Sequence, residues 1–147
     1  MKSIQTKSIT QSIFAITAAV LILIYFSSCA KKISFQSSSV VPAARGDVKV
    51  KKDNNNNYNI QISVNNLAEP KRLQPSKTAY VVWMETDQNS VKNIGQIKSS
   101  KKLFSKALKA SISTVTPHYP TKFFITAENN GDISYPEGET VLTTESF

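Results

Sequence analysis

Apolar and polar residues alternate on both sides of a short Asn-rich run, and this pattern constrains the fold more than any other feature of the chain. Residues 47–52 place Val48 and Val50 on one face, and residues 58–64 place four apolar side chains on one face. A period of two is that of a β-strand, whose successive side chains point to opposite faces. Between them, residues 53–57 (DNNNN) predict a turn, because Asn and Asp tolerate left-handed backbone. The sequence therefore predicts a β-hairpin with one buried face and one wet face.

Further strand patterns follow, with turn signals between them. Residues 78–86 (TAYVVWMET) are apolar on both faces, which is typical of a central strand covered on both sides. Residues 91–97 predict a returning strand with a bulge at Gly95, and residues 121–128 and 140–144 predict two more strands. Short strands at regular spacing indicate an all-β chain: an immunoglobulin-like β-sandwich of about seven strands, preceded by a signal helix and a flexible tether.

Two segments are compatible with more than one structure. Residues 103–115 fit either an amphipathic helix or a strand in which Leu108, Ala110 and Ile112 face inward. Near the start of the tether, Ile33 alternates with polar neighbours and is compatible with a short first strand. The pattern alone leaves both alternatives open.

The N-terminus has the composition of a targeting segment. Lys2 and Lys7 form a positive region with no acidic neighbour, and residues 13–26 (IFAITAAVLILIYF) are an uninterrupted apolar run of 14 residues. A helix that spans a bilayer needs roughly 20 residues, so this run is more typical of the apolar part of a signal peptide.

Ser27, Ser28 and Cys29 follow the apolar run directly, with Phe26 before them. This arrangement resembles the lipobox of bacterial lipoproteins, although Phe26 stands where Leu is usual. The resemblance implies a diacylglyceryl group on the Cys29 thiol and cleavage between Ser28 and Cys29. Two or three acyl chains hold a protein durably at a membrane, whereas one chain binds only marginally. The alternatives are an uncleaved membrane helix and a simply secreted protein.

The predicted organisation is a lipoprotein signal peptide over residues 1–28, a lipidated tether over 29–45 and a β-sandwich domain over 46–147. Removal of the signal peptide, with Lys2 and Lys7, would lower the net charge from +8 to +6. By resemblance to the sorting rules of Gram-negative lipoproteins, the absence of Asp or an acidic run after the Cys argues against inner-membrane retention and against surface export. We expect a lipid-anchored envelope protein in the outer membrane that faces the periplasm.

A second resemblance covers residues 78–144. The order AYVVWMET, IGQI and TPHYPTKFFITAE is similar to the extracytoplasmic sandwich domain at the C-terminal end of anti-sigma-K-type factors. The resemblance implies a shared fold and a sensing or docking role. Those factors also have a cytoplasmic sigma-binding part and a membrane-spanning helix. If the lipobox interpretation holds, direct sequestration of a sigma factor is excluded.

Charge is unevenly distributed along the chain. Residues 29–122 hold 16 basic and 5 acidic residues, whereas residues 123–147 hold 5 acidic and no basic residues. A basic surface attracts anions, so we single out a candidate anion-binding cluster formed by Lys98, Lys101, Lys102, Lys106 and Lys109. A second group comprises Lys49, Lys51 and Lys52. The plainer interpretation is a solvated strand face, with lysines that protect a sheet edge.

The aromatic residues of the strands are expected in the core, with one exception. If Phe123 and Ile125 point inward, Phe124 points outward and is a candidate partner surface. Tyr80 and Trp83 are expected to be core residues.

Composition limits the chemistry of the chain. One Cys, one His and four Gly exclude an internal disulfide, multi-Cys or multi-His zinc sites and Gly-rich phosphate loops. His118 lies between prolines without a partner motif, so no catalytic residue, metal ligand or cofactor is predicted beyond the lipid on Cys29. We expect a non-catalytic binding or structural module whose partners are the membrane and an envelope protein or an anionic glycan or lipid, but not nucleic acid. The alternatives are a regulatory subunit of an envelope signalling complex and, disfavoured, a small hydrolase.

Overall fold

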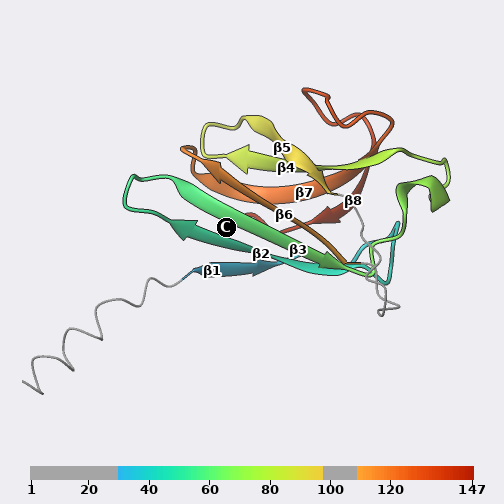
Figure 1. Cartoon of the computed structure of the whole chain (residues 1–147), viewed down its shortest axis with the longest axis horizontal. Coiled ribbons are helices and arrows are strands. Elements are labelled where there is room, and N and C mark those ends of the chain that lie inside the picture. The colour runs from blue at the N-terminus through green and yellow to red at the C-terminus, as the bar shows by residue number, and fades with distance from the viewer. Residues whose placement is uncertain (1–29, 98–108) are drawn as a thin grey trace, which may run out of the picture.

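The computed structural model describes residues 30–97 and 109–147, which form two β-sheets packed face to face (Figure 1). The strands are β1 (Lys31–Ser34), β2 (Arg45–Lys52), β3 (Tyr58–Asn65), β4 (Ala79–Thr86), β5 (Val91–Ile97), β6 (Lys109–Thr116), β7 (Pro120–Glu128) and β8 (Glu139–Thr143). One 3₁₀ turn, η1 (Pro70–Arg72), lies between β3 and β4. Sheet A has the order β1-β2-β3-β6 and sheet B the order β5-β4-β7-β8, with all neighbours antiparallel. The predicted all-β immunoglobulin-like sandwich is confirmed.

Neighbouring strands within each sheet come from distant parts of the chain. β3 pairs with β6 along its whole length, from Tyr58 opposite Thr116 to Asn65 opposite Lys109, although β4 and β5 lie between them in sequence. β4 pairs with β7 in the same way in sheet B. These long connections pass from one sheet to the other and fix the two sheets over a common core.

The core lies between the sheets and takes alternate residues from the long strands β2, β3, β4 and β7. On β3, Ile60, Ile62 and Val64 are buried, and Val48 and Val50 of β2 lie beside them. Sheet B supplies a matching set of buried side chains, which comprises Tyr80, Val82, Met84, Phe123, Ile125 and Ala127. The alternation in the sequence therefore predicted the inward faces of β2 and β3 correctly.

Two local predictions are also confirmed. Asp53 Oδ1 accepts hydrogen bonds of 2.9 Å from the backbone N–H groups of Asn55 and Asn57, which closes the Asn-rich turn. Where β4 pairs with β5, Val82 lies opposite Gly95 and Trp83 lies opposite Asn93. The β5 residue between these two partners, Ile94, is therefore bulged. Gly95 has φ +131°, a left-handed conformation that favours glycine.

The structure resolves part of the ambiguity over residues 103–115. Lys109–Thr116 form a strand in which Ala110 is buried and Ser111 and Ser113 are exposed. Residues 98–108 lie outside the described residues.

The expected tether extends too far into the chain. β1 pairs with β2, so the alternative of a short first strand is the correct one. After β1, Phe35, Val41 and Ala44 are buried in the core, and the backbone N–H of Gln36 donates a 2.8 Å hydrogen bond to the carbonyl of Thr143. These apolar contacts make residues 31–45 part of the sandwich instead of a spacer.

Three turns gather at the end of the sandwich where β1 begins, and we call this the turn end (Figure 1). They are residues 53–57, 87–90 and 117–119, and the carbonyl of Tyr119 accepts a hydrogen bond from the N–H of Asp87. The loops over residues 66–78 and 129–138 lie at the opposite end, the loop end. Among residues 30–97 and 109–147, no helix is long and apolar enough to cross a membrane.

Candidate functional site

The outer face of sheet A carries a polar surface that runs across all four strands. The ladder places Lys32 of β1 opposite Lys49 of β2, Lys49 opposite Gln61 of β3, and Gln61 opposite Ser113 of β6. All four side chains are exposed. Because alternate residues of a strand share a face, this row lies on the outer face of sheet A, opposite the face that covers the core.

A shallow hollow of about 420 Å³ lies on this face. Its lining includes Lys49 and Lys51 of β2, Asn59 and Gln61 of β3, and Ala30 at the start of the described chain. The exposed side chain of Val115 also lines it, and carbon atoms make up most of the lining. The polar part of the lining includes ammonium and amide groups. Both groups donate hydrogen bonds, and an ammonium also carries the charge that favours an anionic oxygen as acceptor.

The lysines on this face exceed what protection of a sheet edge requires. β1 is an edge strand of sheet A, and edge strands commonly carry lysines that block pairing with another chain. At Lys49, β2 is an interior strand paired with Lys32 of β1, so this explanation does not cover Lys49. Lys32 and Lys49 lie directly opposite each other, an arrangement of like charges that destabilises a sheet. An anion bound between them would relieve this repulsion.

Carboxylates neutralise only part of this charge. Lys32 Nζ lies 3.6 Å from Asp47 Oδ1, and both groups are partly exposed. Within the described part of the chain, no carboxylate forms an ion pair with Lys49 or Lys51. The face is therefore suited to bind an anion and offers Lys, Asn, Gln and Ser side chains to it.

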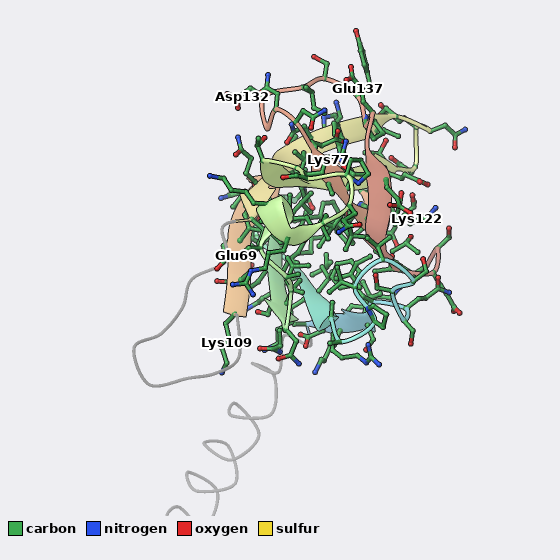
Figure 2. The ribbon with its side chains drawn as sticks, turned by 90° about the vertical axis from the view of Figure 1, so that its right-hand side faces the viewer. Glu69, Lys77, Lys109, Lys122, Asp132 and Glu137 are labelled. Carbon is green, nitrogen blue, oxygen red and sulfur yellow. The ribbon has the colours of Figure 1, made fainter. Side chains whose placement is uncertain are left out.

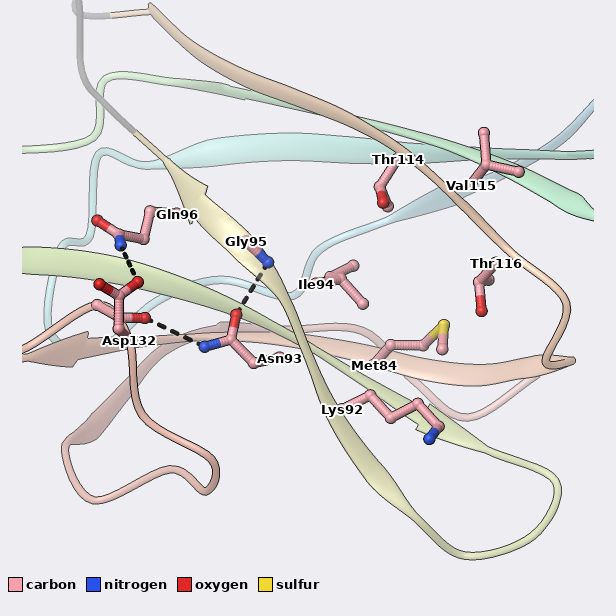
Figure 3. A pocket seen from close by; sticks show the side chains of 11 residues that line it. Met84, Lys92, Asn93, Ile94, Gly95, Gln96, Thr114, Val115, Thr116 and Asp132 are labelled. Carbon is pink, nitrogen blue, oxygen red and sulfur yellow. Dashed lines mark hydrogen bonds between the residues drawn. The ribbon is translucent and has the colours of Figure 1, made fainter.

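A second depression separates the exposed edges of the two sheets, between β5 and β6 (Figure 3). It has a volume of about 690 Å³. Asn93 donates hydrogen bonds to the carbonyls of Gly131 and Ile133, and Gln96 donates one to Asp132 Oδ1. These amides hold the β7–β8 loop against β5, so much of the polar lining of the depression already has a structural role.

The predicted lysine cluster lies mostly outside the described residues. Lys98, Lys101, Lys102 and Lys106 fall in residues 98–108, and Cys29 and Ser28 fall in residues 1–29. Lys109 is exposed and begins β6 at the loop end, away from Lys31 at the start of β1. Figure 2 shows it on the sheet A side, with Asp132 and Glu137 on the sheet B side.

The expectation that Phe124 is exposed is wrong. Phe124 does lie on the outer face of sheet B, opposite to Phe123 and Ile125, but it is only 9% exposed. Its ring stacks on Trp83 at a centroid distance of 6.3 Å, and Ile133 of the β7–β8 loop packs against this pair. The outer face of sheet B thus has a small apolar cluster of its own, covered by the loop over residues 129–138.

The other ionisable residues of the described chain either contact structural partners or have no partner of a catalytic type. Glu85 Oε1 lies 3.2 Å from Lys122 Nζ on the neighbouring strand. His118 lies in the β6–β7 turn, where its backbone N–H bonds to Thr116 Oγ1. Across residues 30–97 and 109–147, no three His, Cys, Asp or Glu side chains come together in a way that could hold a metal ion.

The sequence pattern points to Lys49 and Lys51 but does not point to the residues that complete the face. Lys32 was assigned to the tether, and Asn59, Gln61 and Ser113 were seen only as the wet side of strands. The residues of this face come together only through strand pairing, which joins residues more than 10 positions apart in the sequence.

The described residues define an immunoglobulin-like β-sandwich domain with a cationic polar face. No family model matches the chain, and neither a curated protein nor a solved structure matches it.

Proposed function

We propose that this protein is a lipid-anchored lipoprotein of the cell envelope, whose β-sandwich is a non-catalytic binding module. The observation that carries the proposal is the apolar run of residues 13–26 followed by Ser27, Ser28 and Cys29. The fold supports it, because β1 begins at Lys31, two residues after Cys29. A chain cleaved before Cys29 would keep every strand of the sandwich.

The binding role rests on the outer face of sheet A. Strand β2 presents Lys49 and Lys51 to solvent beside the amides of Asn59 and Gln61, without a carboxylate partner in the described chain. The chemical class that such a face would take is an anionic group with several oxygen acceptors. The proposed site of action is the periplasmic face of the outer membrane.

Mass spectrometry and fatty-acid labelling test the anchor. The mature protein should begin at Cys29, carry a diacylglyceryl group there and incorporate labelled fatty acid. Cys29→Ala should incorporate none and should keep its signal peptide. A mature protein that starts elsewhere, or label that persists in Cys29→Ala, would overturn the anchor. Ser27→Ala is the matched control, since a small residue remains and processing should continue.

Protease treatment tests the location. In intact cells the sandwich should resist an added protease, and it should become sensitive when the outer membrane is permeabilised. Digestion in intact cells would place the domain on the cell surface instead.

A further inference from the structure

The lysine-rich corner of the sandwich lies directly beside the proposed anchor. Ala30 lines the same hollow as Lys49 and Lys51. Cys29 precedes Ala30 in the chain, and consecutive Cα atoms are about 3.8 Å apart. Acyl chains on Cys29 would therefore hold this hollow close to the bilayer surface.

The register of β1 against β2 concentrates positive charge at this corner. Lys31 lies opposite Val50, so Lys51 and Lys52 extend past the start of β1 toward the anchor. We call the resulting group the lysine corner, which comprises Lys31, Lys32, Lys49, Lys51 and Lys52. Asp47, which pairs with Lys32, and Asp53, whose Oδ1 closes the Asn-rich turn, offset two of these five charges. The lysine corner therefore keeps a net positive charge.

Aromatic rings accompany these lysines at the turn end. Lys52 Nζ lies 5.7 Å from the centroid of the Tyr58 ring, and Tyr58 makes an edge-to-face contact with Tyr119. Tyr119 is 42% exposed. Tyrosine is enriched at membrane–water interfaces, where its ring and hydroxyl lie at the level of the headgroups.

Acidic side chains gather at the other end of the molecule, on its sheet B side. Asp132 and Glu137 belong to the β7–β8 loop at the loop end, on the sheet B side (Figure 2). Glu139 begins β8 at the same end and is exposed. The loop end also carries Lys71, Arg72, Lys77 and Lys109, so its charge is mixed, whereas the lysine corner keeps a net positive charge. An anionic membrane surface would therefore attract the lysine corner more strongly, and charge and anchor favour the same orientation.

We propose that the lysine corner docks onto the anionic headgroups of the membrane that holds the anchor. This inference rests on the lipid anchor of the proposed function. The occupant is a lipid headgroup, whose phosphate oxygens accept hydrogen bonds from Lys49, Lys51 and the neighbouring amides. Docking fixes the orientation of the sandwich, with the turn end at the membrane and the loop end away from it.

The test uses the full lipidated protein in vesicles of phosphatidylcholine, with or without phosphatidylglycerol. An environment-sensitive fluorophore is attached to Asn54→Cys in the Asn-rich turn or, as a matched position, to Ser134→Cys in the β7–β8 loop. Both native side chains are exposed, and lipidation blocks the thiol of Cys29. Flotation of the protein with the vesicles in high salt reports the anchor separately from docking.

With phosphatidylglycerol, the probe at position 54 should be shielded from an aqueous quencher, and the probe at position 134 should not. Lys51→Gln together with Lys52→Gln should lower the ratio of docked to undocked protein about fivefold per charge removed. Lys71→Gln together with Lys77→Gln, which removes two charges at the loop end, should leave this ratio unchanged. High salt should abolish the shielding while the protein still floats.

Three results would overturn the inference. Equal exposure of the two probes in a protein that floats would disprove docking alone and leave the anchor intact. Failure to float would disprove the anchor and docking together. Shielding of position 54 by dextran sulfate on neutral vesicles, without shielding by phosphatidylglycerol, would identify a soluble polyanion as the ligand instead of the membrane.

Discussion

Trp83 Nε1 donates a 2.8 Å hydrogen bond to Thr126 Oγ1 across neighbouring strands of sheet B. The Thr126 hydroxyl in turn donates to Glu128 Oε1 at 2.6 Å. The same carboxylate oxygen accepts from the backbone N–H groups of Glu137 and Gly138, at 3.2 Å and 3.0 Å. A buried polar chain therefore ties the loop over residues 129–138 onto the outer face of the sheet, where it covers Phe124.

Replacement of Glu128 should loosen this loop. Glu128→Ala removes a charged acceptor that serves three donors in a buried site, so we expect the free energy of unfolding to fall by about 3 kcal/mol. Urea unfolding measures the change. Glu139→Ala, at an exposed carboxylate, should shift stability by less than about 0.5 kcal/mol. Equal urea midpoints for Glu128→Ala and the wild type would contradict this role.

Tyr80 makes the protein sensitive to alkali. Burial raises the pKa of Tyr80 from 10.0 to about 12. Because the folded pKa lies above the unfolded one, the contribution of Tyr80 to stability is constant below pH 10 and falls as the pH rises toward 12. The expected loss is about 2–3 kcal/mol, measured by urea unfolding at a series of pH values.

Tyr80→Phe tests the source of that loss. Among the described residues, the Tyr80 hydroxyl meets no hydrogen-bond partner, so its removal should leave neutral stability unchanged or raise it by about 1 kcal/mol. The variant should also lack the fall between pH 10 and 12 that is attributed to this residue. Tyr135→Phe, at an exposed position, should retain the fall. If the stability of Tyr80→Phe still fell between pH 10 and 12, the loss would come from other groups.

Gly95 is required by the bulge in β5. At φ +131° an L side chain is strained, and a Cβ would approach Ile112 Cδ1 to 2.5 Å. Gly95→Ala should therefore cost about 1–2 kcal/mol in unfolding free energy, mostly through backbone strain. Ile112→Val in the same chain removes the close atom but not the strain. If Ile112→Val fully restored the stability of Gly95→Ala, the contact with Ile112 would account for the loss instead of the backbone strain at position 95.

Phe35 tests whether residues 31–45 belong to the sandwich. Phe35 is buried in the core, so Phe35→Ala should lower the free energy of unfolding by about 3 kcal/mol. Thermal or urea unfolding measures this loss. Ser37→Ala, at an exposed position, is the control and should have little effect. A neutral Phe35→Ala would restore the interpretation of this segment as a spacer.

The amino-acid sequence by itself determined where β2, β3, β4, β5, β7 and β8 lie and which side chains of β2 and β3 face inward. The period of two is a local property, and each residue in the pattern is near its neighbours in the chain. The Asn-rich turn and the bulge at Gly95 were predictable for the same reason, because both depend on the backbone preferences of one or a few residues.

Only the tertiary structure decided the features that need partners from elsewhere. Residues 109–116 carry a pattern compatible with helix or strand, and full pairing with β3 selects the strand. Phe124 points away from the main core as its position predicted, yet a loop held by Glu128 buries it. The lysine corner exists because β1 and β2 pair in one register. Strand pairing and loop cover join residues that are distant in the chain, so their free energy depends on contacts that no local pattern contains.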